Sequence, residues 1–390
     1  ATHPFMDSSV HPSAPTAADR QHRAAPTSNG QAANGALAQH RQRTTVLWLS
    51  GLSLLLGMTA ILALGTGAVD IPPGAVLAIL ADQVGLSMPW SFETRQVLVL
   101  TNIRLPRIIL GLVVGAGLSV SGAMMQGLFR NPLADPGLIG VSSGAALGAV
   151  ATIVLLPAAS AGATAIWSSA VLLPLAAFAG GVIATVVVYR LATSNGRTSV
   201  ATMLLAGIAI NAVAGAGTGM LTFVADDDQL RDLTFWSLGS LGGATWSSLA
   251  VVGPCVLLCV LAAPILARSL NAMLLGESEA QHLGINTQWV KRVVIGGAAL
   301  AVGASVAVSG IIGFVGLVVP HLLRLAAGPD HRMLLPGSAL LGCTLLVAAD
   351  LLSRIVVRPA ALRIGIVTAL VGGPFFLWLL LRQRGRSPVL

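Results

Sequence analysis

The feature that most constrains this chain is a series of long apolar runs that begins at Val46 and continues almost to the C-terminus. A helix of about 20 apolar residues crosses a hydrocarbon core about 30 Å thick, and many of these runs are that long. Only 9% of the 390 residues are charged, too few to cover a water-exposed surface, so a water-soluble enzyme is excluded. Long runs instead of alternating ten-residue segments also disfavour a β-barrel. The sequence therefore predicts an all-α polytopic membrane protein.

About ten runs are expected to span the membrane. The predicted spans cover residues 46–68, 99–128, 138–156, 166–192, 199–224, 246–266, 287–308, 312–327, 333–354 and 364–382. A run at 230–238 is too short to cross and predicts an interfacial helix. Residues 1–44 are rich in Ala, Pro, Ser and Gln and lack apolar periodicity. They predict a disordered cytoplasmic N-terminal tail before a transmembrane domain at 45–386.

The positive charges predict the orientation of the spans. The net charge of +8 could suggest nucleic-acid binding, but the charges stand at the ends of apolar runs, so no nucleic acid is expected. With both termini in the cytoplasm, thirteen of the 22 Lys and Arg residues lie inside and seven outside, and the other two lie in the tail. This distribution follows the positive-inside rule, and the opposite orientation would invert it.

Glycines at four-residue spacing predict close helix packing, because they place small residues on one helix face. The sets are Gly111 with Gly115, Gly140 with Gly144 and Gly148, and Gly215 with Gly219. Tight packing within the bundle is favoured over a seam between two chains. Cys255, Cys259 and Cys343 form no metal-type pair and are expected to be small packing residues.

The chain shows no obvious energy source of its own. A nucleotide-binding loop of the GxxxxGK[ST] type needs a Lys, but Lys291 is the only Lys and follows no glycine-rich loop. Ion-coupled carriers usually bury carboxylates in the membrane, and the best candidate, Asp350, has Arg354 four residues on as an expected partner. A stand-alone ion-coupled carrier therefore remains only as an alternative, and a partner protein is expected to supply the energy.

A cytoplasmic partner needs a binding surface outside the membrane. The longest polar stretch between spans on the inner face is 271–288. Within it, Glu277, Glu279, Gln281 and His282 form a polar face, and Ala280 with Leu283 a small apolar one. The pattern predicts a short surface helix that ends at Gly284. An ordinary loop is an equally good interpretation of composition alone.

Four segments resemble the permeases of type II ABC importers, the family that brings iron-siderophores, haem and cobalamin into bacteria. They are IRLPRIILGLVVGAGLSVSGAMMQGLFRNPLADPGLIGVSSGAALG at 103–148, GESEAQHLGI from Gly276, SGIIGFVGLVVPHLLRLAAGPDHRMLLPGSALLG at 309–342 and ADLLSRIVVRPAALRIGIVTALVGGPFFLWLL from Ala349. The resemblance covers about 46–384, and the family fold has ten helices per subunit, in agreement with the ten predicted spans.

The resemblance implies a non-catalytic subunit in a larger assembly in the bacterial inner membrane. A second copy would complete one translocation path, two cytoplasmic ABC ATPase subunits would use the ATP, and a periplasmic binding protein would dock outside. No permanently bound cofactor is implied. The family's ATPase-coupling helices correspond to about 271–284, and the matching residues are Gly276, Glu277, Ala280, Leu283 and Gly284. A Glu277→Arg change is expected to leave the protein inserted and to lower ATPase association.

The family's docking arginines for the binding protein match Arg104, Arg107 and Arg354. Arg104 and Arg107 are three residues apart, on one helical face, on the side where positive charge is scarce. Snorkelling to lipid phosphates is the alternative.

The family's cytoplasmic gate matches Asn131 and Leu133 in the NPLADP turn, and Val200 and Ala201 at the start of a span. The cobalamin permeases have hydroxyl residues where this chain has Val200 and Ala201, so an apolar lining of the path is expected here. Arg231, which comes after three consecutive Asp residues at the outer mouth, either meets an anionic substrate group or pairs locally.

Two segments resemble the haem importers most, namely LRDLTFWSLGSLGGATW and PHLLRLAAGPDHR. Haem is therefore the expected cargo, with ferric siderophore and then cobalamin as alternatives. His282, His321 and His331 are expected near the inner face as structural residues, without a metal site.

Overall fold

The computed structural model describes residues 28–67, 69–156, 169–357 and 360–384, and this part of the chain is almost entirely helical. The elements in chain order are α2 (Ser28–Gly65), α3 (Pro73–Asp82), α4 (Thr94–Val99), the π-helical turn η1 (Leu100–Arg104), α5 (Leu105–Phe129), the 3-10 turn η2 (Pro136–Ile139), α6 (Val141–Leu155), α7 (Ser169–Leu191), β1 (Thr193–Ser194), β2 (Arg197–Thr198), α8 (Val200–Val224), α9 (Asp227–Ser237), α10 (Trp246–Leu274), α11 (Glu277–His282), α12 (Thr287–Ser309), α13 (Val315–Ala327), α14 (His331–Ile355) and α15 (Ile364–Arg384). The strands β1 and β2 form a two-residue antiparallel hairpin.

The chain divides into two compact units, residues 1–47 and 48–390. In the first unit the described residues are the beginning of α2, which starts at Ser28, before the first predicted span. Residues 1–27, most of the predicted tail, lie outside the described residues. The second unit holds every other element.

The all-α prediction is confirmed, and each of the ten predicted spans contains a helix. Seven helices in the described residues are long and apolar enough to cross a membrane: those in α2, α5, α7, α8, α10, α12 and α14. The apolar helices Val141–Leu155, Val315–Ala327 and Ile364–Leu379 are shorter. The short helix predicted at 230–238 is α9. The sequence interpretation missed α3, which begins at Pro73, where the fixed φ of proline suits a first helical turn.

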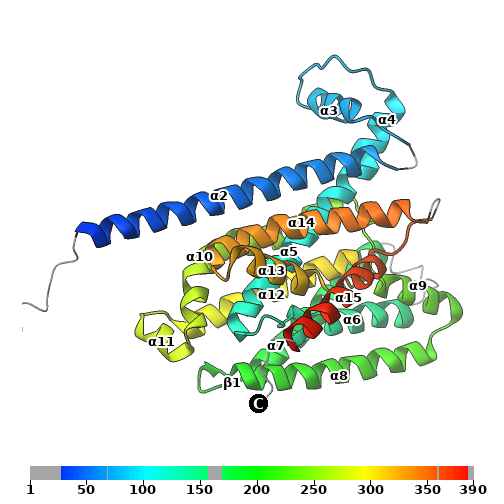
Figure 1. Ribbon diagram of the computed structural model, residues 1–390. Helices are drawn as coiled ribbons and strands as arrows, with labels where there is room; N and C mark the ends of the chain where they lie inside the picture. The colour runs from blue at the N-terminus through cyan, green and yellow to red at the C-terminus, as the bar shows by residue number, and fades with distance from the viewer. Residues whose placement is uncertain (1–27, 68, 157–168, 358–359, 385–390) are drawn as a thin grey trace, which may run out of the picture. The chain divides into compact units, whose positions relative to one another are not determined.

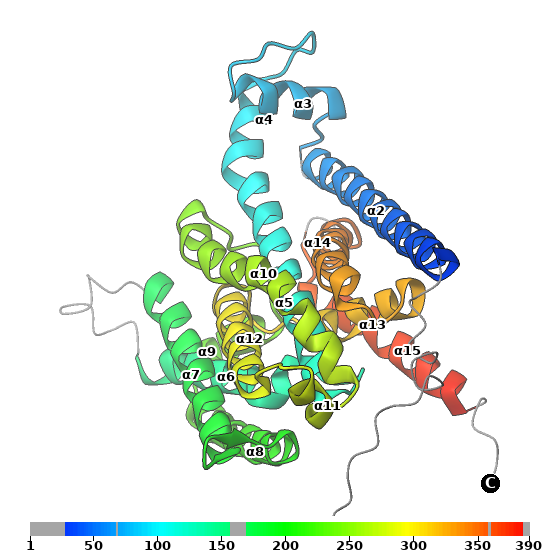
Figure 2. The ribbon, with the colours of Figure 1, turned by 90° about the vertical axis from the view of Figure 1, so that its left-hand side faces the viewer.

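Helix α5 lies at the centre of the second unit, where it packs against α10, α12, α13 and α14 (Figures 1 and 2). From Val114 to Phe129 every residue of α5 is buried, which explains its nearly continuous apolar and small-residue sequence. A second layer is formed by α6, which packs on α7 and α8. The N-terminal end of α5 also closes a smaller apolar cluster that includes Ile71, Val76 and Leu100.

Glycine packing is confirmed at some of the predicted positions. A Cβ atom on Gly115 would lie 2.4 Å from the carbonyl oxygen of Gly342, and one on Gly144 would lie 2.3 Å from that of Gly180. These helices touch backbone to backbone, which only glycine permits. At Gly215 and Gly219 the prediction of packing within the bundle is wrong, because an added Cβ would meet nothing within 4 Å. Both lie on the exposed side of α8.

Side-chain hydrogen bonds cap the N-termini of three elements near the candidate sites. Asp135 accepts the N–H of Gly137 at 2.7 Å and starts η2. Ser199 accepts the N–H of Thr202 at 3.3 Å and starts α8, and Asp330 accepts the N–H of Arg332 at 2.9 Å and starts α14. Such caps satisfy amide groups that have no partner inside the helix.

Candidate functional site

The three arginines predicted to dock a binding protein lie in one group, but they point into the protein. Arg107 binds Asp350 through Nε at 3.0 Å and through its terminal nitrogen at 2.9 Å. Arg354 meets the other oxygen of Asp350 at 3.1 Å, as the i,i+4 spacing predicted. The side chain of Asp350 is 4% exposed. Two guanidinium groups therefore share one buried carboxylate, and the group keeps a net positive charge.

Arg104 and Arg354 also hold the C-terminal end of α2. Arg104, which is 5% exposed, donates to the carbonyl oxygens of Leu64, Gly65 and Val69. Arg354 donates to those of Ala63 at 3.1 Å and Thr66 at 3.0 Å. Cations at a helix C-terminus satisfy its free carbonyls and oppose its negative dipole end. No sequence spacing indicated these contacts of Arg104 and Arg354 with the backbone at the end of α2.

Helix α11 occupies the segment predicted to couple to an ATPase, between two glycines with positive φ. Gly276 has φ +129° and Gly284 has φ +80°, conformations that side chains rarely adopt. The expectation that Ala280 and Leu283 share an apolar face is wrong: Ala280 is fully buried, whereas Leu283 is 63% exposed. The helix is only six residues long, and the fourth residue points into the core while Leu283 lies just after its end.

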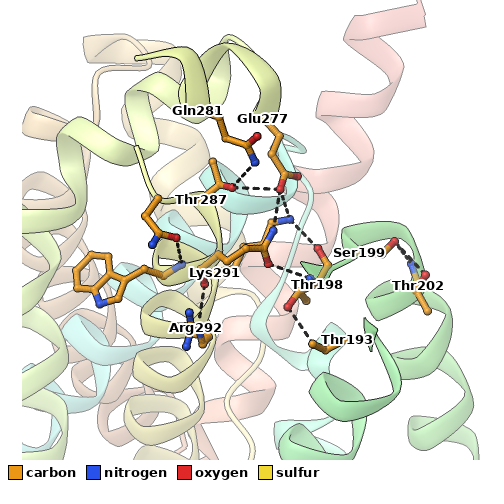
Figure 3. Close-up of polar contacts among 12 residues, drawn as sticks. Thr193, Thr198, Ser199, Thr202, Glu277, Gln281, Thr287, Lys291 and Arg292 are labelled. Carbon is orange, nitrogen blue, oxygen red and sulfur yellow. Dashed lines mark hydrogen bonds and ion pairs between the residues drawn. The ribbon is translucent and has the colours of Figure 1, made fainter. Parts of the chain in front are cut away.

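Glu277 lies on the inner side of α11 and binds Lys291, the only Lys of the chain (Figure 3). Their charged atoms, Oε1 and Nζ, are 2.6 Å apart, and the Lys291 side chain is 1% exposed. A Glu277→Arg change would therefore place a second cation beside a buried ammonium group, so it is expected to destabilise α11. Lower ATPase association stays a prediction, but this variant would not separate it from the effect on α11.

The residues predicted at the gate lie at the start of α8 and in the turn after α5. Val200 is half-buried against the core and Ala201 is exposed, in the first turn of α8. Asn131 Oδ1 accepts the N–H of Leu133 at 2.9 Å, which forms a tight turn. The turn leads into η2, which packs on α8 beyond its first turns, where the side-chain amide of Asn211 donates to the carbonyl oxygen of Gly137 at 3.2 Å.

Two aspartates near these turns have shifted pKa values. Burial raises the pKa of Asp135, although the N–H of Gly137 opposes the shift. Burial alone would also raise the pKa of Asp330, but the N–H of Arg332, the amide of Asn271 and two nearby positive charges outweigh it and lower that pKa.

Arg231 pairs locally, one of the two alternatives left open by its sequence context. Its guanidinium group lies 3.0 Å from Asp228, and both side chains are exposed, at 64% and 85%. Such a pair contributes little stability. Among the described residues, no group of three or more His, Cys, Asp or Glu could hold a metal ion.

Long apolar helices with a short polar helix between two of them match a known protein family over most of the chain. The model of the FecCD transport family matches residues 54–382. This chain belongs to the FecCD transport family. It is an ABC importer permease, and so a multi-pass protein of the bacterial inner membrane, as the resemblance of its motifs implied.

Individual relatives of this FecCD permease include haem and cobalamin proteins. The chain is 46% identical to the hemin transport system permease protein HmuU of Yersinia pestis, over 85% of this chain and 96% of the relative. It is 43% identical to the cobalamin import system permease protein BtuC of Halobacterium salinarum, over 88% and 90%. It is 39% identical to the vitamin B12 import system permease protein BtuC of Escherichia coli, over 89% and 99%.

A solved structure has the same fold as this FecCD permease. It is an inward-facing conformation of a metal-chelate type ABC transporter, with a TM-score of 0.74 and 32% identity over 86% of this chain and 98% of the other. Membership of the family implies ATPase and binding-protein partners and dimerisation.

Proposed function

We propose that this chain is the permease subunit of a haem importer. The observation that carries the proposal is the 46% identity to a hemin permease, higher than the 43% and 39% to the cobalamin permeases. A second copy would complete the path, two cytoplasmic ABC ATPases would drive it, and a periplasmic binding protein would deliver haem. Both termini would lie in the cytoplasm, in agreement with the thirteen to seven distribution of Lys and Arg.

The surfaces of the chain support these partners. Leu283 and Glu279 are exposed at α11, where an ATPase would dock. The positive charge left around Asp350 suits an acidic partner on the opposite side. Gly215 and Gly219 form a small-residue stripe on the exposed side of α8, which allows a second copy to approach closely.

Cobalamin is the second candidate, supported by the 43% identity over 90% of the Halobacterium salinarum permease. Ferric siderophore is the third. The apolar pair Val200 and Ala201 at the start of α8 favours an apolar cargo such as haem over a polar one.

Reconstitution tests the proposal directly. The permease, its ATPase and its binding protein would be placed in liposomes, with the binding protein loaded with haem, ferric siderophore or cobalamin in turn. We expect haem to give the largest stimulation of ATP hydrolysis and ATP-dependent uptake. Stimulation by cobalamin or siderophore alone would reassign the substrate, and uptake by the permease alone under an ion gradient would support the carrier alternative.

A further inference from the structure

The backbone of Thr198, two residues before α8, is held on both sides by side chains of α12. Its N–H donates to Gln288 Oε1 at 2.9 Å, and its carbonyl oxygen accepts from Lys291 Nζ at 2.6 Å (Figure 3). Thr198 is 3% exposed. Buried amide groups paired in this way are costly to release, so the position of this peptide depends on that of α12.

The same two side chains also hold α11, through Glu277. Its Oε1 atom accepts from Lys291 Nζ at 2.6 Å and from Gln288 Nε2 at 3.1 Å. Thr287 adds a third donor at 3.3 Å. We call Glu277, Gln288 and Lys291 the Thr198 clamp. Each of its two α12 side chains bonds to Glu277 on one side and to Thr198 on the other.

The Thr198 clamp lies beside a cavity. A cavity of about 360 Å³ lies between α11 and the hairpin, lined on one side by Ser278 and Gln281 and on the other by Arg197 and Ser199. Apolar packing does not fill this space, so the polar side chains at its edge connect the two elements. The hydrogen bonds to Glu277 and Lys291 are charge-assisted, and the Lys291 side chain is buried, so these bonds are stronger than those between neutral groups.

The residues directly after Thr198 join the clamp to α8. Ser199 caps α8, its N–H donates to the carbonyl oxygen of Ala192 at 2.9 Å, and Val200 begins the helix. The hairpin is closed further by a 2.9 Å hydrogen bond between the hydroxyls of Thr193 and Thr198. A displacement of Thr198 therefore moves the first turn of α8.

We propose that Gln288 and Lys291 are positioning residues that make the start of α8 move together with α11. This inference rests on the proposed function, in which an ATPase moves α11 and the first turn of α8, at Val200 and Ala201, controls the path. An equilibrium at one place changes another only through an element that both contact, and the Thr198 clamp is such an element.

The first test measures the link in the full-length permease alone. Spin labels on Ser194 and Glu279, which are exposed, would report the distance between the hairpin and α11 in a chain whose three cysteines are replaced by Ala. We expect a narrow distance distribution for the unchanged clamp and a broad one for Lys291→Met. Arg292→Met is the matched control, because Arg292 is the next cation along and is exposed. It should leave the distribution narrow.

The second test measures coupling in the complex with ATPase and binding protein. We expect Lys291→Met to retain ATP hydrolysis while substrate uptake per ATP falls about fivefold or more. Gln288→Leu keeps the Lys291–Glu277 pair, so it serves where Lys291→Met fails to fold, and it should lower the ratio in the same direction. Arg292→Met should keep the unchanged ratio.

A folded Lys291→Met or Gln288→Leu permease with a narrow distance distribution and unchanged uptake per ATP would overturn the inference. Failure of the proposed function would look different, because the complex with the unchanged permease would then show no uptake at all. The label distances would still decide whether the clamp links α11 to α8.

Discussion

Asp350 is the residue at which segments far apart in the chain meet. Asp350 pairs with both Arg107 and Arg354. Arg354 also donates a hydrogen bond to a backbone carbonyl at the end of α2. Loss of Asp350 would leave two guanidinium groups without their carboxylate, whereas loss of one arginine would leave a single ion pair. The same residues carry the surplus positive charge that we propose for docking of the binding protein.

Two substitutions that change the charge of this group in opposite directions distinguish an effect on docking from an effect on stability. Asp350→Asn removes a negative charge, so association with an acidic binding protein should become faster at low salt. Arg107→Gln removes a positive charge, so association should become slower. Both variants weaken the same ion pair, and structural damage alone would slow both.

Stopped-flow association rates at low and high salt would measure these effects. Because charges are screened beyond about 10 Å at 0.1 M salt, the two variants should converge at high salt. Rates that fall in both variants, or a difference that salt does not reduce, would contradict docking at this group.

At the scale of elements, short polar segments fix where the helices begin. The cap of α14 is an example, because Asp330 accepts from the backbone of Arg332 and from the amide of Asn271, at 2.9 Å and 2.6 Å. Asn271, near the end of α10, in turn accepts the N–H of His331 at 2.9 Å. One carboxylate thus joins the end of α10, the helix that precedes α11, to the start of α14.

The lowered pKa of Asp330 predicts a pH-dependent contribution to stability. Because the folded-state pKa lies below the unfolded value of about 4, the carboxylate stabilises the fold above that pH, and this stability is lost as the pH falls through the folded pKa. Asp330→Ala should lower stability near neutral pH by about 1 kcal/mol. The difference should shrink towards acid pH.

Asp330→Asn is the control, because Asn caps helices but does not titrate. Thermal unfolding in detergent across this pH range would measure both variants. If the gap between the unchanged protein and Asp330→Asn were constant with pH, ionisation of Asp330 would not contribute to stability.

At the scale of the whole molecule, the buried ion pairs of the second unit lie near the ends of helices, while its interior is packed mainly by apolar and small residues. Helix α5 is the centre of that packing, and the arginine group lies at its N-terminal end. Two helices that pack on α5 connect it to the Thr198 clamp. Helix α10 is followed in the chain by α11, and α12 carries Gln288 and Lys291.

Leu283 gives the sharpest test of the proposed ATPase contact. It is 63% exposed and its side chain lies outside the Thr198 clamp, so Leu283→Asp should leave the permease folded. In the complex, the aspartate would be buried against the ATPase, and association should weaken about tenfold or more. Leu86→Asp is a matched control, because Leu86 is 62% exposed in the loop after α3. Equal recovery of ATPase with both variants in a pull-down would argue against docking at α11.

Composition, the length of the apolar runs and motif order were enough to predict the membrane environment, most of the helices and the family. Apolar runs of about 20 residues can satisfy their backbone in a bilayer only as helices, so a helix within each predicted span and the short α9 were predictable. Motif order identified a type II ABC permease. Local spacing also predicted the pairing of Arg354 with Asp350, because an i,i+4 pair lies on one helix face.

The long-range contacts of the polar side chains became visible only in the folded chain. Arg107 and Asp350 are 243 residues apart, and Lys291 lies 93 residues from Thr198, so no local pattern records either contact. The same holds for glycine: Gly115 meets Gly342, whereas Gly215 meets nothing in the described part of its own chain. Helix formation in a membrane depends on composition over one segment, but the partner of a buried charge depends on how separate helices pack, and that is a property of the folded chain.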